Sequence, residues 1–126
     1  MVKRELQKSA YVQADETGMR QDGKNGYVWA FCNPDYALYE FDPTRARAVA
    51  ERVLGIDYNG YTVNDGYNAY DHFRHQRCWV HILREAYALD ENYSKAALQV
   101  KILHEMYDQA TAAKGEPPDK RREIRN

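Results

Sequence analysis

The sequence predicts an α/β fold built on a mixed sheet, and three observations support this prediction. Three short apolar segments follow one another near the N-terminus and are separated by turn residues, which is typical of an antiparallel meander. A segment with helical spacing comes next and leads to a fourth apolar segment. A helix between two strands permits a parallel, right-handed crossover, so the fourth strand can lie beside the first. The length of 126 residues, 44% of them hydrophobic, suits one domain.

The first three strands are expected within the first 41 residues. A mixed apolar segment at residues 9–15 ends at Asp15 and forms the first strand. Residues 18–26 follow, and their Asp-Gly and Asn-Gly pairs favour a tight hairpin. The second strand, residues 27–32, is nearly all apolar, which indicates burial on both faces. The third strand is expected at residues 36–41.

A helix then connects the third strand to the fourth. Asp42 or Thr44 can cap its start, and Gly55 can end it. The fourth strand is expected at residues 60–64, and Asp65 follows it directly. The crossover therefore brings the ends of the first and fourth strands together.

The last part of the chain is expected to be mostly helical. The remaining elements are a short helix or loop at residues 67–73, a brief fifth strand near residues 77–79, a helix at residues 80–89 and a long helix that is capped by Ser94 and ends near Ala113. Residues 114–126 are polar and are expected to fray. The predicted domain thus covers residues 1–113, followed by a polar tail.

The overall charge argues against a self-sufficient DNA-binding module. The net charge is −1 at pH 7, whereas such modules are usually basic because they neutralise phosphates. Basic side chains do gather between residues 72 and 84, so DNA affinity is either local or supplied by another segment of a longer protein. The two cysteines make no disulfide framework, and no apolar stretch is long enough to span a bilayer. A cytoplasmic location without membrane contact is therefore expected.

Asp15 and Asp65 are the main candidate site residues. If the first and fourth strands are neighbours, both carboxylates lie at the same end of one sheet, which is the ribonuclease H-like arrangement. Carboxylate oxygens bind Mg²⁺, and paired ions stabilise the attacking and leaving oxygens of a phosphodiester. Aspartate at a strand end is also a common turn residue, so turn formation is the alternative interpretation. We predict a Mg²⁺ or Mn²⁺ site with Asp15 and Asp65 as its catalytic ligands.

Three blocks of sequence carry a family resemblance. The blocks are Asp15-Glu16-Thr17 with residues 22–29 (Asp-Gly-Lys-Asn-Gly-Tyr-Val-Trp), residues 63–70 (Val-Asn-Asp-Gly-Tyr-Asn-Ala-Tyr) and residues 76–85 (Gln-Arg-Cys-Trp-Val-His-Ile-Leu-Arg-Glu). In this order they resemble the catalytic domain of DDE insertion-sequence transposases of the IS66 family, over roughly residues 9–110. The resemblance implies a ribonuclease H-like domain that cuts transposon ends and joins them to target DNA with two metal ions. Asp15 and Asp65 match its first two catalytic carboxylates.

The third carboxylate of that family is a glutamate in an Asn-Asn-x-x-Glu context, which nothing in this chain matches. The resemblance therefore implies a catalytic-core fragment, truncated at its C-terminus, lacking the family's N-terminal DNA-binding region and inactive alone. Glu85 lies next to the basic cluster and could substitute for the missing glutamate at a distance. Glu91 and Glu105 are further in-chain alternatives.

Five more residues are predicted to support the site or to contact DNA. They are Lys24, Arg77, Cys78, His81 and Arg84. Cys78 and His81 have the spacing of half a zinc site, but the chain has only one other cysteine, Cys32, to complete it. We interpret Cys78 as packing and His81 as a residue at the edge of the site. Arg84 lies on the same helix face as His81, where it contacts phosphate, pairs with a catalytic carboxylate or is solvated.

Three functions remain open from the sequence. The first is the core fragment of a transposase, with transposon-end DNA as its partner in the full-length protein and possible homo-oligomer formation. The second is a non-enzymatic module that dimerises with, or inhibits, a full-length transposase, which an exposed apolar surface would favour. The third is a small ribonuclease H-like nuclease that recruits Glu85 or another residue.

Overall fold

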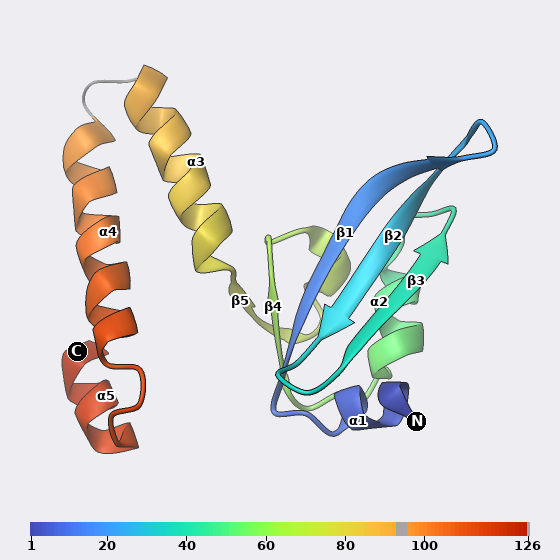
Figure 1. Cartoon of the computed structure of the whole chain (residues 1–126), viewed down its shortest axis with the longest axis horizontal. Coiled ribbons are helices and arrows are strands. Elements are labelled where there is room, and N and C mark those ends of the chain that lie inside the picture. The colour runs from blue at the N-terminus through green and yellow to red at the C-terminus, as the bar shows by residue number, and fades with distance from the viewer. Residues whose placement is uncertain (93–95, 126) are drawn as a thin grey trace. The chain divides into compact units, whose positions relative to one another are not determined.

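Five strands form one mixed sheet in the first part of the chain (Figure 1). The computed structural model describes residues 1–92 and 96–125. They fall into two compact units, Met1–Cys78 and Trp79–Asn126. The sheet belongs to the first unit.

The strand order in the sheet is β3-β2-β1-β4-β5. The strands are β1 (Tyr11–Gln21), β2 (Lys24–Cys32), β3 (Ala37–Asp42), β4 (Tyr61–Asn64) and β5 (Arg74–Arg77). The first three form an antiparallel meander, whereas β4 pairs in parallel with both β1 and β5. The predicted α/β class is therefore confirmed, including the crossover that sets β4 beside β1, and the arrangement is consistent with a ribonuclease H-like fold.

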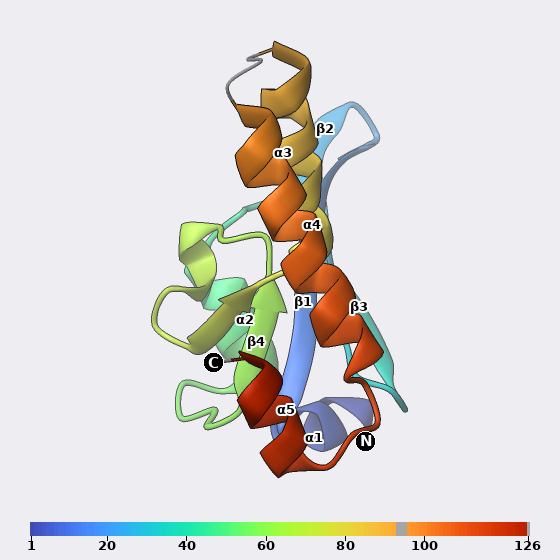
Figure 2. The ribbon, with the colours of Figure 1, turned by 90° about the vertical axis from the view of Figure 1, so that its left-hand side faces the viewer.

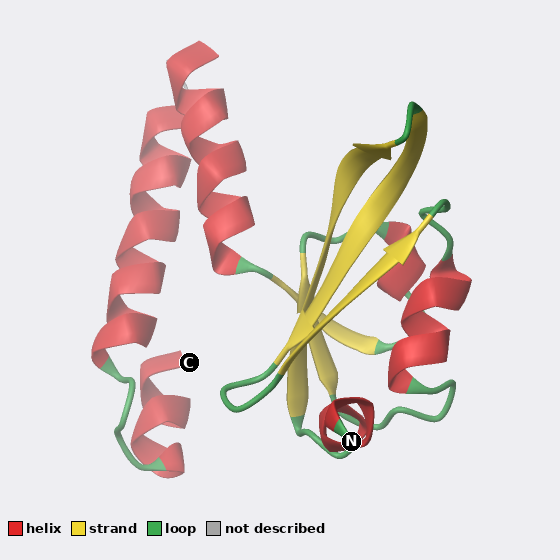
Figure 3. Ribbon diagram, turned by 45° about the vertical axis from the view of Figure 1, so that its right-hand side comes forward, coloured by secondary structure: helices red, strands yellow, loops and turns green. Residues whose placement is uncertain are grey.

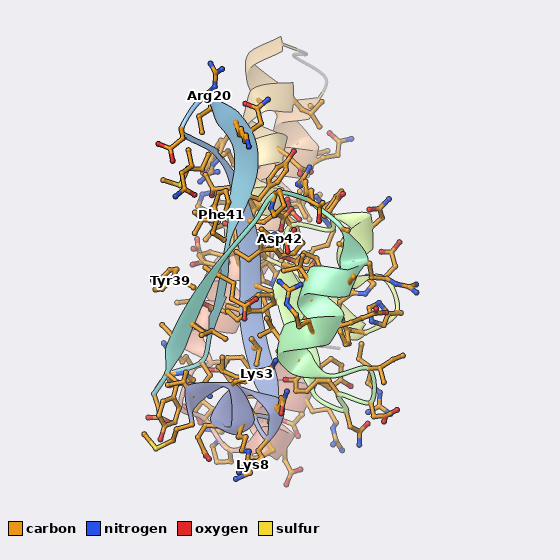
Figure 4. The ribbon with its side chains drawn as sticks, turned by 90° about the vertical axis from the view of Figure 1, so that its right-hand side faces the viewer. Lys3, Lys8, Arg20, Tyr39, Phe41 and Asp42 are labelled. Carbon is orange, nitrogen blue, oxygen red and sulfur yellow. The ribbon has the colours of Figure 1, made fainter. Side chains whose placement is uncertain are left out.

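The hairpin between β1 and β2 turns at Asp22 and Gly23. Both residues have positive φ angles, 49° and 78°, as a tight type I′ turn requires. The predicted Asp-Gly turn is thus confirmed, and Arg20 lies near the tip of the hairpin (Figure 4). The Asn-Gly pair lies inside β2 instead, where the ring of Phe41 occupies the space that a Cβ on Gly26 would need.

One face of the sheet carries the hydrophobic core. On β1, Val12 and Ala14 alternate with exposed residues, and on β2 the rings of Trp29 and Phe31 stack with their centroids 6.2 Å apart. Such alternation marks a strand with one covered face. The full cluster comprises Leu6, Val12, Ala14, Trp29, Phe31, Val49, Ala50, Val53, Leu54, Ala69, Tyr70 and Phe73.

Two helices and a 3₁₀ turn cover this face. They are α1 (Val2–Gln7), α2 (Arg47–Leu54) and η1 (Asn68–Tyr70), and Figure 3 shows α2 lying alongside the sheet. The side-chain amide of Gln7 donates a hydrogen bond to the backbone oxygen of Val53 at 2.8 Å, which ties α1 to α2. Helix α1 is not anticipated by the sequence analysis.

The opposite face of β3 is solvent-exposed. Tyr39 is 69% and Phe41 45% exposed, and Figure 4 shows both on the side of β3 away from α2. These two rings form an exposed apolar patch on β3.

Helix α2 begins later than predicted. Its first residue is Arg47, and its N-cap residue, Ala46, makes no side-chain cap. The Asp42 carboxylate instead accepts hydrogen bonds from the backbone N and Oγ1 of Thr44, at 2.8 and 2.7 Å, in a turn before the helix. The predicted end at Gly55 is confirmed, because Gly55 is the C-cap residue with φ of 90°.

The fifth strand and the end of the chain also differ from the predictions. Strand β5 spans Arg74–Arg77 and not residues 77–79; its four exposed polar residues carry no apolar alternation. The polar tail forms a helix, α5 (Pro118–Arg125), where fraying was expected. Proline suits the first position of a helix, because its missing N–H would have no partner there.

Two long helices make up most of the second unit. Helices α3 (Trp79–Asn92) and α4 (Ala97–Ala112) run side by side in opposite directions (Figure 2). Ring contacts join them: the centroids of Trp79 and Tyr107 are 6.0 Å apart, and those of Tyr87 and His104 are 5.5 Å apart. Ser94, the predicted cap, lies outside the described residues.

Candidate metal-binding site

The two predicted aspartates lie just beyond the paired part of β1 and β4. The last paired residues are Gln13 and Val63, and Asp15 and Asp65 each follow two residues later. Side chains alternate between the two faces of a strand, and Val12, Ala14 and Glu16 face the core. Asp15 therefore lies on the opposite face. Asp65 directly follows β4, and the two aspartates therefore belong to adjacent, parallel chain segments.

A turn built by Asn64 holds Asp65 in place. The buried Asn64 side chain accepts a hydrogen bond from the backbone N of Gly66 at 2.8 Å and donates one to Thr62 Oγ1 at 3.0 Å. One carboxylate oxygen of Asp65 accepts the backbone N–H of Tyr67 at 2.9 Å. Asn64 thus forms the turn and indirectly orients Asp65.

A further acidic residue, Glu16, follows Asp15 on β1 and points to the core face of the sheet. Its side chain is 0% exposed. Glu16 Oε1 accepts hydrogen bonds from Arg45 Nε at 2.8 Å and Nη2 at 2.5 Å, and Oε2 accepts one from the Tyr70 hydroxyl at 2.6 Å. A buried carboxylate needs such partners, because its loss of hydration is otherwise unfavourable by several kcal/mol.

The side chain of Arg45 extends from Glu16 to Asp65. Its Nη2 lies 3.9 Å from Asp65 Oδ2, and its guanidinium carbon lies 3.7 Å from the ring centroid of Tyr67. The Tyr67 hydroxyl donates to the backbone oxygen of Arg45 at 2.9 Å. Burial acts to lower the pKa of Arg45, but the hydrogen bonds and charge of Glu16 outweigh it and the pKa is raised. Arg45 therefore remains a cation beside Asp65.

The Tyr70 hydroxyl donates a hydrogen bond to Glu16 and is affected by the charges of three carboxylates. Burial raises the pKa of Tyr70 far above its usual value, and the hydrogen bond to Glu16 raises it further. The negative charges of Glu16, Asp15 and Asp65 act in the same direction. Tyr70 consequently stays protonated and acts as a fixed hydrogen-bond donor.

Two of the predicted supporting residues adjoin Asp65. Arg77 Nε donates to the backbone oxygen of Asp65 at 3.3 Å, and the backbone N of Cys78 donates to that of Asn64 at 2.6 Å. Lys24 lies elsewhere, exposed beside the hairpin turn. The thiol of Cys32 is 3.7 Å from Gln13 Oε1, on β1.

The other candidate residues lie in the second unit, whereas Asp15 and Asp65 lie in the first. His81, Arg84 and Glu85 are on α3; Arg84 and Glu85 are exposed, and the buried His81 Nδ1 finds no hydrogen-bond partner among the described residues. Glu105 is paired with Lys101 at 3.9 Å on the surface of α4. The side chain of Glu91, a further candidate, lies outside the part of the chain that the structure describes.

The donor set at the end of β1 and β4 consists of two carboxylates. Across residues 1–92 and 96–125, no three His, Cys, Asp or Glu side chains form a group that could hold a metal ion. This holds for zinc as well as for other metals. Carboxylate oxygens are nonetheless the ligands that Mg²⁺ and Mn²⁺ prefer. The residues present therefore fit part of a divalent-metal site.

Sequence reasoning assigned no role to Glu16 or Arg45. One signal was available for Glu16, since Val12, Ala14 and Glu16 occupy successive inward positions of the first strand. A carboxylate at an inward position requires a buried cation or donor. Which cation provides the partner depends on contacts between segments 29 residues apart, which no local pattern reveals.

The fold is consistent with the ribonuclease H-like class, because an antiparallel meander is joined by the parallel strand β4. Asp15 and Asp65 each lie two residues beyond the last pair of β1 and β4. A family model described as the transposase IS66 family matches residues 1–126, and the chain therefore belongs to this family of transposases. Comparisons with curated proteins and with solved structures give no match. Among the described residues, no helix is long and apolar enough to cross a membrane.

Proposed function

We propose that this chain is the catalytic core of a DDE transposase, in which Asp15 and Asp65 hold Mg²⁺ or Mn²⁺ for DNA strand cleavage and strand transfer. The observation that supports this most is the parallel pairing of β1 with β4, whose last pair, Gln13 with Val63, lies two residues before Asp15 and Asp65. Membership of the transposase family supplies the context of DNA transposition.

The chemistry divides between the metal and the protein. Bound divalent ions would stabilise the charge that develops on the attacking and leaving oxygens of a phosphodiester. The chain presents the hard oxygens of Asp15 and Asp65 and fixes Asp65 through the N–H of Tyr67. Two carboxylates fill only part of the octahedral oxygen shell of Mg²⁺. We therefore expect weak binding, and little or no turnover, from these residues alone.

DNA is the proposed partner, in the form of transposon ends bound by the full-length protein. Arg77 supports this assignment, because its side chain reaches the backbone of Asp65 and carries positive charge next to the site. Lys24, Cys78, His81 and Arg84 remain proposed supporting or DNA-contacting residues, and Glu85 a proposed substitute for the third carboxylate.

A Mn²⁺ titration, followed by the electron paramagnetic resonance signal of free Mn²⁺, tests the proposal. Asp15→Asn and Asp65→Asn remove one charge each and keep the side-chain shape, and each should weaken binding at least about tenfold. Asp57→Asn is the matched control, because Asp57 is exposed in the loop between α2 and β4. Equal binding by all three variants and the unaltered chain would refute the metal site.

A second candidate function, self-association as an interaction module, is supported by the exposed rings of Tyr39 and Phe41. These rings lie on β3, an edge strand of the sheet, and exposed apolar edge strands pair readily with a second copy. Sedimentation velocity should then show a dimer that Tyr39→Lys dissociates. Ile56→Lys is the control, because Ile56 is 72% exposed but lies in a loop. A monomer at all concentrations would exclude this function.

A further inference from the structure

Glu16 and Arg45 form an ion pair that adjoins the carboxylate of Asp65. Glu16 follows Asp15 in the chain but faces the core, where its side chain is 0% exposed. Arg45 donates to it at 2.8 Å through Nε and at 2.5 Å through Nη2, and the same Nη2 lies 3.9 Å from Asp65 Oδ2. One guanidinium therefore faces two carboxylates, of which Glu16 is the closer.

Arg45 is held in place from several sides. The Tyr67 ring lies 3.7 Å from its guanidinium carbon, and the Tyr67 hydroxyl binds its backbone oxygen at 2.9 Å. The Tyr70 hydroxyl fixes the second oxygen of Glu16 at 2.6 Å. Because these contacts oppose a swing of the side chain, the charge of Arg45 stays near Asp65 when another cation approaches.

A fixed positive charge so close to a ligand oxygen opposes the binding of a divalent cation, because like charges repel at short distance. The negative charge of the Glu16 carboxylate, which is paired with Arg45, compensates this positive charge. We propose that Glu16 is a positioning residue for the metal site: it holds Arg45 and neutralises it, so that Asp65 can accept a divalent cation. This inference rests on the proposed function of Asp15 and Asp65 as metal ligands.

The test is a Mn²⁺ titration of the full chain at one fixed pH. Glu16→Gln keeps the shape and hydrogen bonding of the side chain but removes its charge. We expect the Mn²⁺ dissociation constant to rise about 10- to 100-fold, the range seen when outer partners of metal ligands are removed. Glu40→Gln is the matched control, because Glu40 pairs with another arginine, Arg52, at 3.1 Å. Its dissociation constant should stay within about twofold of that of the unaltered chain.

A charge-balanced double variant separates neutralisation from a structural role. Glu16→Gln with Arg45→Gln removes both charges, and Mn²⁺ binding should return to within about threefold of the unaltered chain. A double variant as weak as Glu16→Gln would overturn the inference, since a purely structural role predicts no recovery. If Glu16→Gln does not fold, as judged by circular dichroism, Arg45→Gln alone decides: binding as tight or tighter supports the inference, and binding about tenfold weaker overturns it.

The two proposals fail in different ways. An unaltered chain that binds no Mn²⁺, or whose binding survives Asp15→Asn, refutes the proposed function. Binding that is lost in Asp15→Asn but unchanged in Glu16→Gln leaves the proposed function standing and overturns the inference about Glu16.

Discussion

Replacing Arg45 with methionine should destabilise the sheet-containing unit by about 2–3 kcal/mol. The variant leaves the Glu16 carboxylate, which is 0% exposed, without its cation. Breaking a fully buried ion pair in this way typically costs about 3–5 kcal/mol. Arg45 is itself 38% exposed, and Tyr70 still donates to Glu16, so the lower value is expected. Methionine keeps most of the arginine stem and limits the loss of packing.

Urea denaturation followed by the fluorescence of Trp29 measures this effect. Trp29 is fully buried in the first unit, and a Trp79→Phe background removes the signal of the second unit. With a slope of about 1–2 kcal/mol per molar urea, the midpoint should fall by roughly 1–3 M. The matched control is Arg52→Met, because Arg52 is 49% exposed although it pairs with Glu40 and Asp42. Exposed pairs of this kind contribute less than about 1 kcal/mol.

A double variant completes the argument. Glu16→Met with Arg45→Met replaces the ion pair by two apolar side chains, which is often neutral or stabilising. Most of the stability lost in Arg45→Met should therefore return, with a coupling of about 2 kcal/mol. The reasoning is refuted if Arg45→Met behaves like the exposed control, or if the two single effects simply add.

Three further changes have defined outcomes. Hydrogen bonds from Thr44 hold the pKa of Asp42 below its usual value of 3.8, so its stabilisation is present above that pH and is lost as the pH falls through the lowered pKa. Asp42→Asn should lose about 1 kcal/mol at pH 7, and this loss should shrink as the pH falls below the usual pKa of 3.8, as urea titrations at a series of pH values would show. Trp29→Ala should lose about 3–5 kcal/mol in thermal melts, because the ring is fully buried. Gly66→Ala should lose about 1–2 kcal/mol in the same melts, since Gly66 has φ of 90° and a Cβ would meet Arg77 Nε at 2.8 Å.

Local chemistry made part of the fold predictable from the sequence. The Asp22-Gly23 turn follows from the φ angles that these two residues tolerate, and the end of α2 at Gly55 follows from the same preference. The parallel placement of β4 beside β1 follows from the helix between the strands. The same pairing places Asp15 and Asp65 two residues beyond its last pair, and their joint role as metal ligands stays a prediction.

Features that depend on distant contacts could not be read from local pattern. Strand β5 consists of Arg-His-Gln-Arg and is a strand because it pairs with β4. Glu16 lies in the Asp15-Glu16-Thr17 block that resembles the family. Its buried ion pair depends on Arg45 and its second hydrogen bond on Tyr70, 54 residues away. Helix α5 begins at a proline in a highly polar segment, a composition that also suits an unfolded tail.

The parallel pairing of β1 with β4 also has a consequence for the order of folding. The β1–β2 hairpin closes over a two-residue turn, whereas Asp15 and Asp65 meet only after a chain of fifty residues has closed into a loop. Loop closure of this kind is slow because its entropy must be lost before the distant contacts form. The two carboxylates should therefore come together in one of the last steps of folding, and the appearance of Mn²⁺ binding during refolding would report on the arrival of β4.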